Sequence, residues 1–98
     1  MAIKKKFLKS KPVCKVTFEL EGIEAENIVA VGDFNKWDTE ATPLKKFKNG
    51  KFKTTIDLEQ GNSYEFRYII DGVYTNDTQA DAYAFNAYAG AENGVLNL

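Results

Sequence analysis

The residues best suited to ligand binding lie between Val31 and Asp38, where the chain reads Val-Gly-Asp-Phe-Asn-Lys-Trp-Asp. This segment holds Trp37, the only tryptophan, among short polar side chains that favour tight turns. Such neighbours are unusual for a core residue, so Trp37 is interpreted as an exposed ring on a rigid turn. The alternative is a ring that folds back and caps the end of the core. An exposed Trp in this position indicates a functional surface.

The ionisable residues give little support to catalysis. The chain has no histidine, the commonest general base and metal ligand. Asp33 with Asp38, or Asp71 with Asp77, could be imagined as a glycosidase pair of acids. Asp33 and Asp71, however, occupy turn positions where a carboxylate caps backbone groups, and a small domain gives little to raise a pKa. We therefore expect a protein that is not an enzyme and uses no cofactor or metal.

Composition limits the protein class further. The 98 residues suffice for one domain with its own core, and the net charge of −1 gives no electrostatic case for nucleic acid. No apolar stretch reaches transmembrane length. The basic start resembles that of a signal peptide, but Lys9 ends the apolar pair Phe7-Leu8, so the apolar region of a signal peptide does not follow. Cys14 is the only cysteine, which fits a reducing compartment. We expect a cytoplasmic protein that binds neither nucleic acid nor membranes.

The elements that must position Trp37 are predicted to be short β-strands. The segments Cys14–Leu20 and Tyr64–Ile70 alternate apolar and polar side chains, which is typical of strands with one buried face. Asn49-Gly50 is predicted to supply both left-handed positions of a type I′ hairpin turn, and Asp71-Gly72 a second two-residue hairpin. The stretch from Asn76 to Glu92 is expected to be irregular. Further strands are expected over residues 28–31, 44–48, 51–58, 73–75 and 94–98.

About seven short strands with frequent turn signals predict an all-β, immunoglobulin-like antiparallel sandwich. Residues 1–12 are a basic lead-in that forms an edge strand or a tail, and residues 13–98 form the domain. Cys14 should face inward on the first strand of the domain. In the strongest strand the alternation leaves Arg67 pointing to solvent if its neighbours are core. Those predicted core neighbours are Tyr64, Phe66, Tyr68 and Ile70.

Several segments resemble the family 48 carbohydrate-binding modules. Gly32–Trp37 resembles the G-x-F-N-x-W signature, Leu58–Gly61 the L-x-x-G turn, and Tyr64–Gly72 the family's Y-x-[FY]-[KR]-[FY]-x-[VI]-D-G strand and turn. Asn93–Val95 resembles the terminal N-[NS]-V strand. The family includes the glycogen-binding domain of AMP-activated kinase β subunits and the early-set domain of isoamylases and branching enzymes. The short length and the lead-in before Cys14 resemble the free-standing bacterial forms.

The resemblance implies an early-set sandwich that binds an α-1,4-glucan such as glycogen, starch or maltodextrin on one face. A flat aromatic ring covers the apolar C–H face of a pyranose, while Arg and Asn hydrogen-bond to its hydroxyl groups. The resemblance therefore assigns carbohydrate binding to the following residues: Trp37, Arg67, Tyr74, Asn93 and Asn35.

Some positions depart from the family pattern. The family's second Trp is Tyr74, the leucine that wedges into the glucan is Ala89, and the nearby Thr is Ala91. A further Trp expected near Thr78 is absent. Each change removes contact area, so the predicted affinity is weak.

The alternative function is an interaction domain that keeps the fold and has lost glycan binding. Such a domain would dock onto a glycan-active enzyme or onto a second copy of itself. The candidate surface is the Tyr- and Ala-rich stretch from Ala80 to Ala91, with Tyr83, Phe85 and Tyr88, unless this stretch packs on the core.

Overall fold

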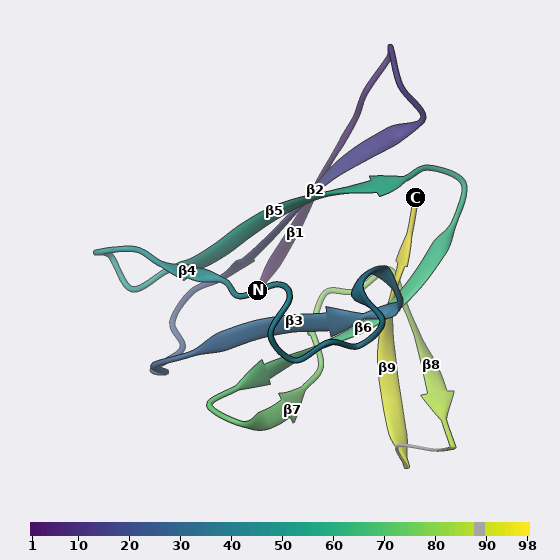
Figure 1. Cartoon of the computed structure of the whole chain (residues 1–98). Coiled ribbons are helices and arrows are strands. Elements are labelled where there is room, and N and C mark those ends of the chain that lie inside the picture. The colour runs from purple at the N-terminus through teal and green to yellow at the C-terminus, as the bar shows by residue number, and fades with distance from the viewer. Residues whose placement is uncertain (88–89) are drawn as a thin grey trace.

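The computed structural model describes residues 1–87 and 90–98 and places two antiparallel sheets against each other (Figure 1). The first sheet has the order β1-β2-β5-β4, and the second has the order β3-β6-β9-β8, with β7 paired to β6. The predicted immunoglobulin-like sandwich is therefore confirmed. The strands of the first sheet are β1 (Ala2–Phe7), β2 (Val13–Leu20), β5 (Phe52–Glu59) and β4 (Lys45–Lys46). Those of the second are β3 (Ile28–Gly32), β6 (Ser63–Ile70), β9 (Ala91–Asn97), β8 (Ala82–Asn86) and β7 (Val73–Thr75).

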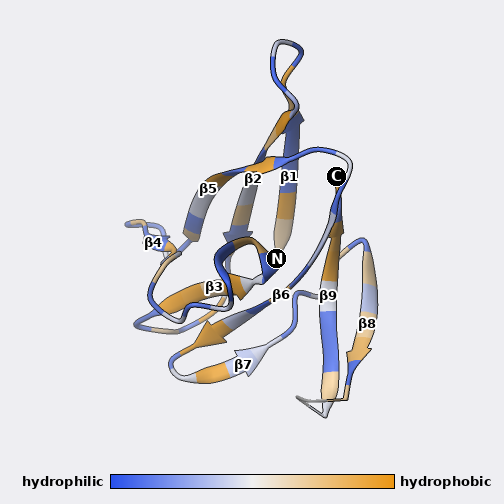
Figure 2. Cartoon of the chain, turned by 45° about the vertical axis from the view of Figure 1, so that its right-hand side comes forward, coloured by the Kyte–Doolittle hydropathy of each residue, from blue (hydrophilic) through white to orange (hydrophobic). Residues whose placement is uncertain are grey.

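Each long strand buries alternate side chains, which appears in Figure 2 as alternating hydrophobic and hydrophilic bands. In β6, Phe66 and Tyr68 are fully buried, whereas Arg67 lies half-buried on the opposite face. Cys14 is buried on β2, as predicted. The register predicted from sequence is thus confirmed, because a slip of one residue would have exchanged the two faces.

Aromatic rings form the centre of the core and connect it to the Trp37 turn. Phe18 on β2 contacts Phe66 at 5.4 Å and Tyr68 at 5.9 Å between ring centroids. Its ring also stacks on Phe34 at 5.9 Å, and Phe34 belongs to the short 3-10 helix η1 (Asp33–Asn35) that follows β3. The base of the turn is therefore part of the core.

A buried polar pair fixes the connection from β7 to β8. The Tyr68 hydroxyl donates to Asp77 Oδ2 at 2.7 Å, and both side chains are fully buried. Asp77 Oδ1 accepts from the Gln79 N–H, and its backbone carbonyl accepts from the Tyr83 hydroxyl. Burial, together with the adjacent carboxylate, raises the pKa of Tyr68 far above its ordinary range. The two acids Asp71 and Asp77 thus have structural partners, since the Asp71 carboxylate accepts from the backbone of Glu26 and Asn27.

Three expectations about local structure were wrong. The described residues hold nine strands: the lead-in forms the edge strand β1, one of its two predicted outcomes, but part of the stretch expected to be irregular forms β8. β8 is ordered because it pairs with β9 along its whole length. The sequence of β8 alone does not predict that pairing. The strand expected over residues 44–48 is reduced to the two residues of β4.

The third error concerns the Asn49-Gly50 turn. Only Gly50 is left-handed there (φ 85°), while the Asn49 side chain accepts from the Lys51 N–H, so the turn is not type I′. Asp71 and Gly72 are both left-handed (φ 46° and 85°), which is the type I′ pattern. Among the described residues, none forms a helix long and apolar enough to cross a membrane.

Candidate functional site

The turn after β3 is built on the side-chain amide of Asn35. Its Oδ1 accepts from the Gly32 N–H at 3.1 Å, and its Nδ2 donates to the Ala30 carbonyl at 3.1 Å and to Thr42 Oγ1 at 3.0 Å. These bonds hold η1 against β3 and against the following loop. The polar atoms of Asn35, a predicted carbohydrate-binding residue, are therefore directed into the scaffold rather than toward a ligand.

Trp37 is held in a strained backbone conformation. Lys36 and Trp37 are both left-handed (φ 57° and 58°), which is uncommon for residues with a side chain. The Trp37 N–H donates to the Gly32 carbonyl at 2.9 Å, which closes the turn. The indole is half-buried, and its Nε1–H donates to Asp33 Oδ1 at 3.0 Å. One edge of the ring is therefore fixed at the surface.

Arg67 and Tyr74 form a second group, on β6 and β7. The Arg67 guanidinium lies 5.6 Å from the centroid of the Tyr74 ring, within the range of a cation–π contact. Arg67 Nε also donates to Asn76 Oδ1 at 3.2 Å, and the Asn76 amide donates to the Glu92 carbonyl at 2.6 Å. Tyr74 is 48 % exposed. The arrangement leaves an accessible ring beside a fixed cation.

Asn93 lies between these groups and is almost fully buried, with 1 % of its surface exposed. Its Nδ2 donates to Glu65 Oε1 at 3.3 Å, while its Oδ1 has no hydrogen-bond partner. An unpaired buried carbonyl oxygen is costly in a folded protein. Asn93 therefore keeps a spare acceptor that the surrounding side chains cover in this structure.

The second sheet brings Arg67 and Tyr74 to one face, because Tyr74 stands opposite Ile69 in the β6–β7 pair. Phe66 and Tyr68 point into the core, so the alternation of β6 places Glu65 and Arg67 together on the outer face. Asp33 Oδ2 accepts from the Glu65 N–H at 2.9 Å, which joins the Trp37 turn to the same strand. The candidate site is therefore the outer face of the second sheet at Arg67 and Tyr74, beside Asn93, together with the Trp37 turn that Asp33 joins to β6.

Sequence reasoning missed Glu65 and Asn76 as members of this network. The period-two pattern of β6 was sufficient to place Glu65 beside Arg67, because the two residues share a face. The sequence around Asn76 gave no signal of its role, because Asn76 bridges Arg67 on β6 and the Glu92 carbonyl on β9.

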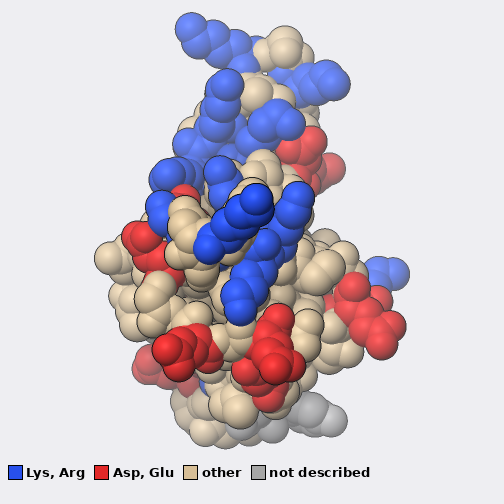
Figure 3. Space-filling view, turned by 90° about the vertical axis from the view of Figure 1, so that its left-hand side faces the viewer, with Lys and Arg blue, Asp and Glu red and all other residues tan. Residues whose placement is uncertain are grey.

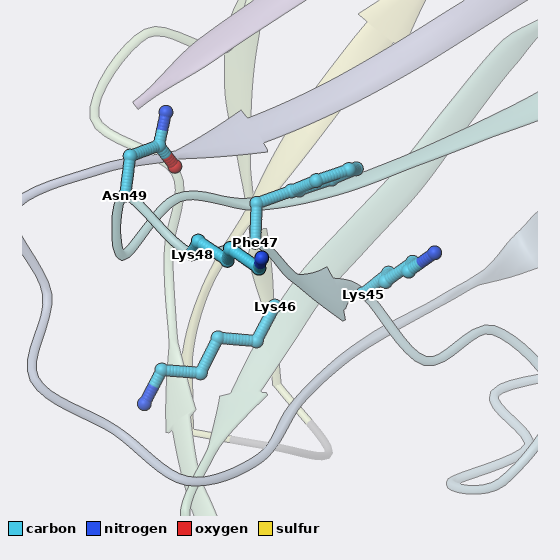
Figure 4. A pocket seen from close by; sticks show the side chains of 5 residues that line it. All are labelled: Lys45, Lys46, Phe47, Lys48 and Asn49. Carbon is cyan, nitrogen blue, oxygen red and sulfur yellow. The ribbon is translucent and has the colours of Figure 1, made fainter.

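A second surface of interest is the lysine-rich outer face of the first sheet and the β4–β5 hairpin. Figure 3 shows lysine side chains gathered over one part of the molecule and acids over another. Phe47, 42 % exposed, lines a shallow hollow with Lys45, Lys46 and Lys48, whose ammonium groups do not converge on one point (Figure 4). β1 and β4 are the edges of this sheet, and lysines on edge strands prevent pairing with other chains. We interpret this surface as edge protection.

The stretch from Ala80 to Ala91 carries exposed aromatic rings. Phe85 is 69 % exposed and Tyr83 is 43 % exposed, although the Tyr83 hydroxyl is anchored to the Asp77 carbonyl. The predictions for Tyr88 and Ala89 fall outside the described residues. The exposed rings on β8 remain a candidate contact surface.

Comparisons with known proteins assign most of the chain to a family. Residues 14–97 match the family described as the glycogen recognition site of AMP-activated protein kinase. The chain is also similar to the chloroplastic phosphoglucan phosphatase LSF1 of Arabidopsis thaliana, with 36 % identity over 77 residues. That match covers 71 % of this chain but only 12 % of the phosphatase. The matched family is a carbohydrate-binding module, and the chain belongs to this glycogen-recognition family.

Proposed function

We propose that this protein is a non-catalytic module that binds α-1,4-glucan on the outer face of the second sheet. The observation that carries the proposal is the hydrogen-bonded link from Trp37 through Asp33 to β6, the strand that also presents Arg67. The family match to a glycogen recognition site supports a glucan rather than another ligand. The cytoplasm remains the proposed location, on the basis of the single unpaired cysteine.

Two kinds of contact are proposed to hold the ligand, namely stacking on aromatic rings and hydrogen bonds to hydroxyl groups. The rings of Trp37 and Tyr74 cover the apolar C–H faces of successive glucose units. Arg67 donates to hydroxyl oxygens. The unpaired Asn93 Oδ1 accepts from a hydroxyl once the ligand displaces the side chains that cover it. An open face of this kind desolvates its ligand less than a closed pocket does, so we expect dissociation constants of roughly millimolar to tens of micromolar, or about −4 to −6 kcal/mol.

The test is an NMR titration with maltoheptaose, comparing the wild type with Trp37→Ala and with Phe47→Ala as a control. Trp37→Ala should remove most of the binding and leave the free energy of unfolding within about 1 kcal/mol, because the ring lies at the surface. Phe47→Ala should bind like the wild type, since Phe47 lies in the β4–β5 hairpin of the first sheet. The proposal fails if tens of millimolar maltoheptaose moves no resonance near Trp37, or if Trp37→Ala unfolds the protein.

A second candidate function is docking onto a glycan-active enzyme or onto another copy of this chain. It is favoured by the exposed rings of Tyr83 and Phe85 on the edge strand β8. Sedimentation of the wild type and of Phe85→Ser tests self-association directly. A wild-type dimer that Phe85→Ser dissociates would establish this function beside or instead of glucan binding.

A further inference from the structure

Asp33 occupies a variable position of the G-x-F-N-x-W signature, yet its carboxylate makes two contacts that no other side chain of the turn could replace. Oδ1 accepts from the Trp37 indole Nε1–H at 3.0 Å, and Oδ2 accepts from the Glu65 N–H at 2.9 Å. The two donors belong to different elements, the turn after β3 and the strand β6. One carboxylate therefore ties the tryptophan ring to the strand that carries Arg67.

The rest of the turn explains why such a tie is needed. The Asn35 amide fixes the backbone of η1 but makes no contact with the indole, and Trp37 itself is in a left-handed conformation. A half-buried ring on this backbone has several staggered orientations available to it. The bond from Nε1–H to Asp33 selects one of them.

We infer that Asp33 is a positioning residue for the glucan site, which sets the orientation of the Trp37 ring relative to the outer face of the second sheet. The inference rests on the proposed function, because the orientation of the ring matters for binding only if a glucan stacks on Trp37. Each contact involves an ionised acceptor, and charge-assisted hydrogen bonds of this type are stronger than neutral ones. Fixing the ring before the ligand arrives lowers the entropy cost of stacking a glucose unit on it.

The substitution Asp33→Asn separates the two contacts without changing the size of the side chain. Asparagine has one oxygen in place of two, so it can accept from only one of the two donors. The Glu65 backbone N–H has no freedom to turn away, whereas the indole does. We therefore expect the variant to keep the backbone contact and to release the ring.

The experiment compares Asp33→Asn with Asp38→Asn, which makes the same charge change in the same turn. Asp38 Oδ1 accepts from the Glu40 N–H, whereas the indole Nε1–H donates to Asp33, so Asp38 is a matched control. Because Trp37 is the only tryptophan, its indole gives a single resonance in the NMR spectrum of the ligand-free protein. Maltoheptaose affinity and the urea midpoint are measured on the same samples.

Asp33→Asn should shift the indole resonance, speed its exchange with water and weaken maltoheptaose binding about fivefold, within the range for one lost hydrogen bond. Asp38→Asn should leave the indole resonance and the affinity unchanged. The inference is overturned if Asp33→Asn leaves the indole resonance in place, or if the resonance moves while the affinity stays at the wild-type value. A wild type that binds no maltoheptaose would overturn the proposed function and, with it, the role of Asp33 in glucan binding.

Discussion

The outer faces of the two sheets carry similar residue types in different arrangements. On the second sheet, Arg67 lies 5.6 Å from the Tyr74 ring and is also hydrogen-bonded to Asn76. On the first sheet, Lys45 lies 5.6 Å from the Phe47 ring but stands directly across from Lys53 on the neighbouring strand. The comparison shows that two cation–aromatic pairs with the same separation differ in whether a further hydrogen bond holds the cation in place.

The charged groups show the same contrast. The lysine-rich face is held by ion pairs, such as Lys4 and Lys51 with Glu19 and Lys15 with Asp57. Ion pairs between exposed side chains contribute little and are screened by salt. The second sheet instead joins its polar groups through hydrogen bonds to backbone and amide groups, which fix direction as well as distance.

The largest expected effect comes from Gly32→Ala, which would disturb the face with the candidate site. A Cβ atom at Gly32 would lie 2.4 Å from the Glu65 carbonyl oxygen and 2.8 Å from the Phe66 Cβ, so β3 and β6 must separate. We expect the free energy of unfolding to fall by about 2–3 kcal/mol, measured by urea denaturation.

Gly50→Ala in the hairpin of the first sheet is the control for that variant. No atom lies within 4 Å of its added Cβ, and only the left-handed backbone (φ 85°) opposes the substitution. The expected loss is about 1 kcal/mol. Equal losses at the two glycines would show that the close approach of β3 and β6 has no special cost.

The next prediction compares the exposed rings of Tyr74 and Phe47, of which only Tyr74 is proposed to contact the glucan. Tyr74→Ala should weaken maltoheptaose binding about five- to tenfold, because a stacked ring contributes on the order of 1 kcal/mol. Isothermal titration of Tyr74→Ala beside Phe47→Ala measures the difference. Equal affinities in the two variants would remove Tyr74 from the site.

Acid should loosen the first sheet before the second. Hydrogen bonds from Lys51 and Lys4 lower the pKa of Glu19. Burial raises the pKa of Asp81, but the bonds from Lys5 and from the Asn97 N–H outweigh it and leave that pKa lowered. A carboxyl group whose pKa is lower in the folded state stabilises the fold above its unfolded pKa, and the stabilisation is lost as pH falls through the folded value.

Both of these carboxylates hold β1, through Lys4 and Lys5. Hydrogen-exchange protection factors should therefore fall in β1 between pH 6 and about pH 3, below the ordinary pKa of a carboxyl group, while those of β6 persist. Simultaneous loss in both strands would contradict the assignment of the ion pairs to local stability.

The smallest effect concerns the lysine pair across β4 and β5. Lys45→Gln removes a like charge directly opposite Lys53, so the free energy of unfolding should rise by up to about 0.5 kcal/mol. Lys48→Gln, outside the paired strands, is the control. Thermal denaturation at low salt measures the change, and a drop in stability would show that the Lys45–Phe47 contact outweighs the repulsion.

Much of the fold could be predicted because burial imposes a strict period of two on β2, β5 and β6. The inward positions of Cys14, Phe18 and Phe66 follow from that pattern alone. β8 could not be predicted, because its order comes from β9 rather than from its own Ala-rich sequence. The failure at Asn49 arose because its side chain bonds to the Lys51 N–H, which removes the need for a left-handed backbone.

The candidate site was predicted less completely than the fold. Sequence placed Arg67 on the outer face and Trp37 on a turn, because both follow from local pattern. The Asn93 side chain bonds to Glu65, which is distant in sequence, and the Asn35 amide bonds to Thr42 in the loop beyond its own turn. Residue type thus indicated a polar contact in each case without giving its partner.

The stacking of Phe34 on Phe18 has a consequence for how the protein would respond to its ligand. Because the base of the Trp37 turn is packed into the core, the turn cannot open without disrupting the centre of the domain. A ligand that needs the ordered Trp37 turn would then bind the folded domain and not the unfolded chain. A glucan at one hundred times its dissociation constant would thereby stabilise the entire sandwich by about 2.7 kcal/mol, and the melting temperature would report saturation of the site.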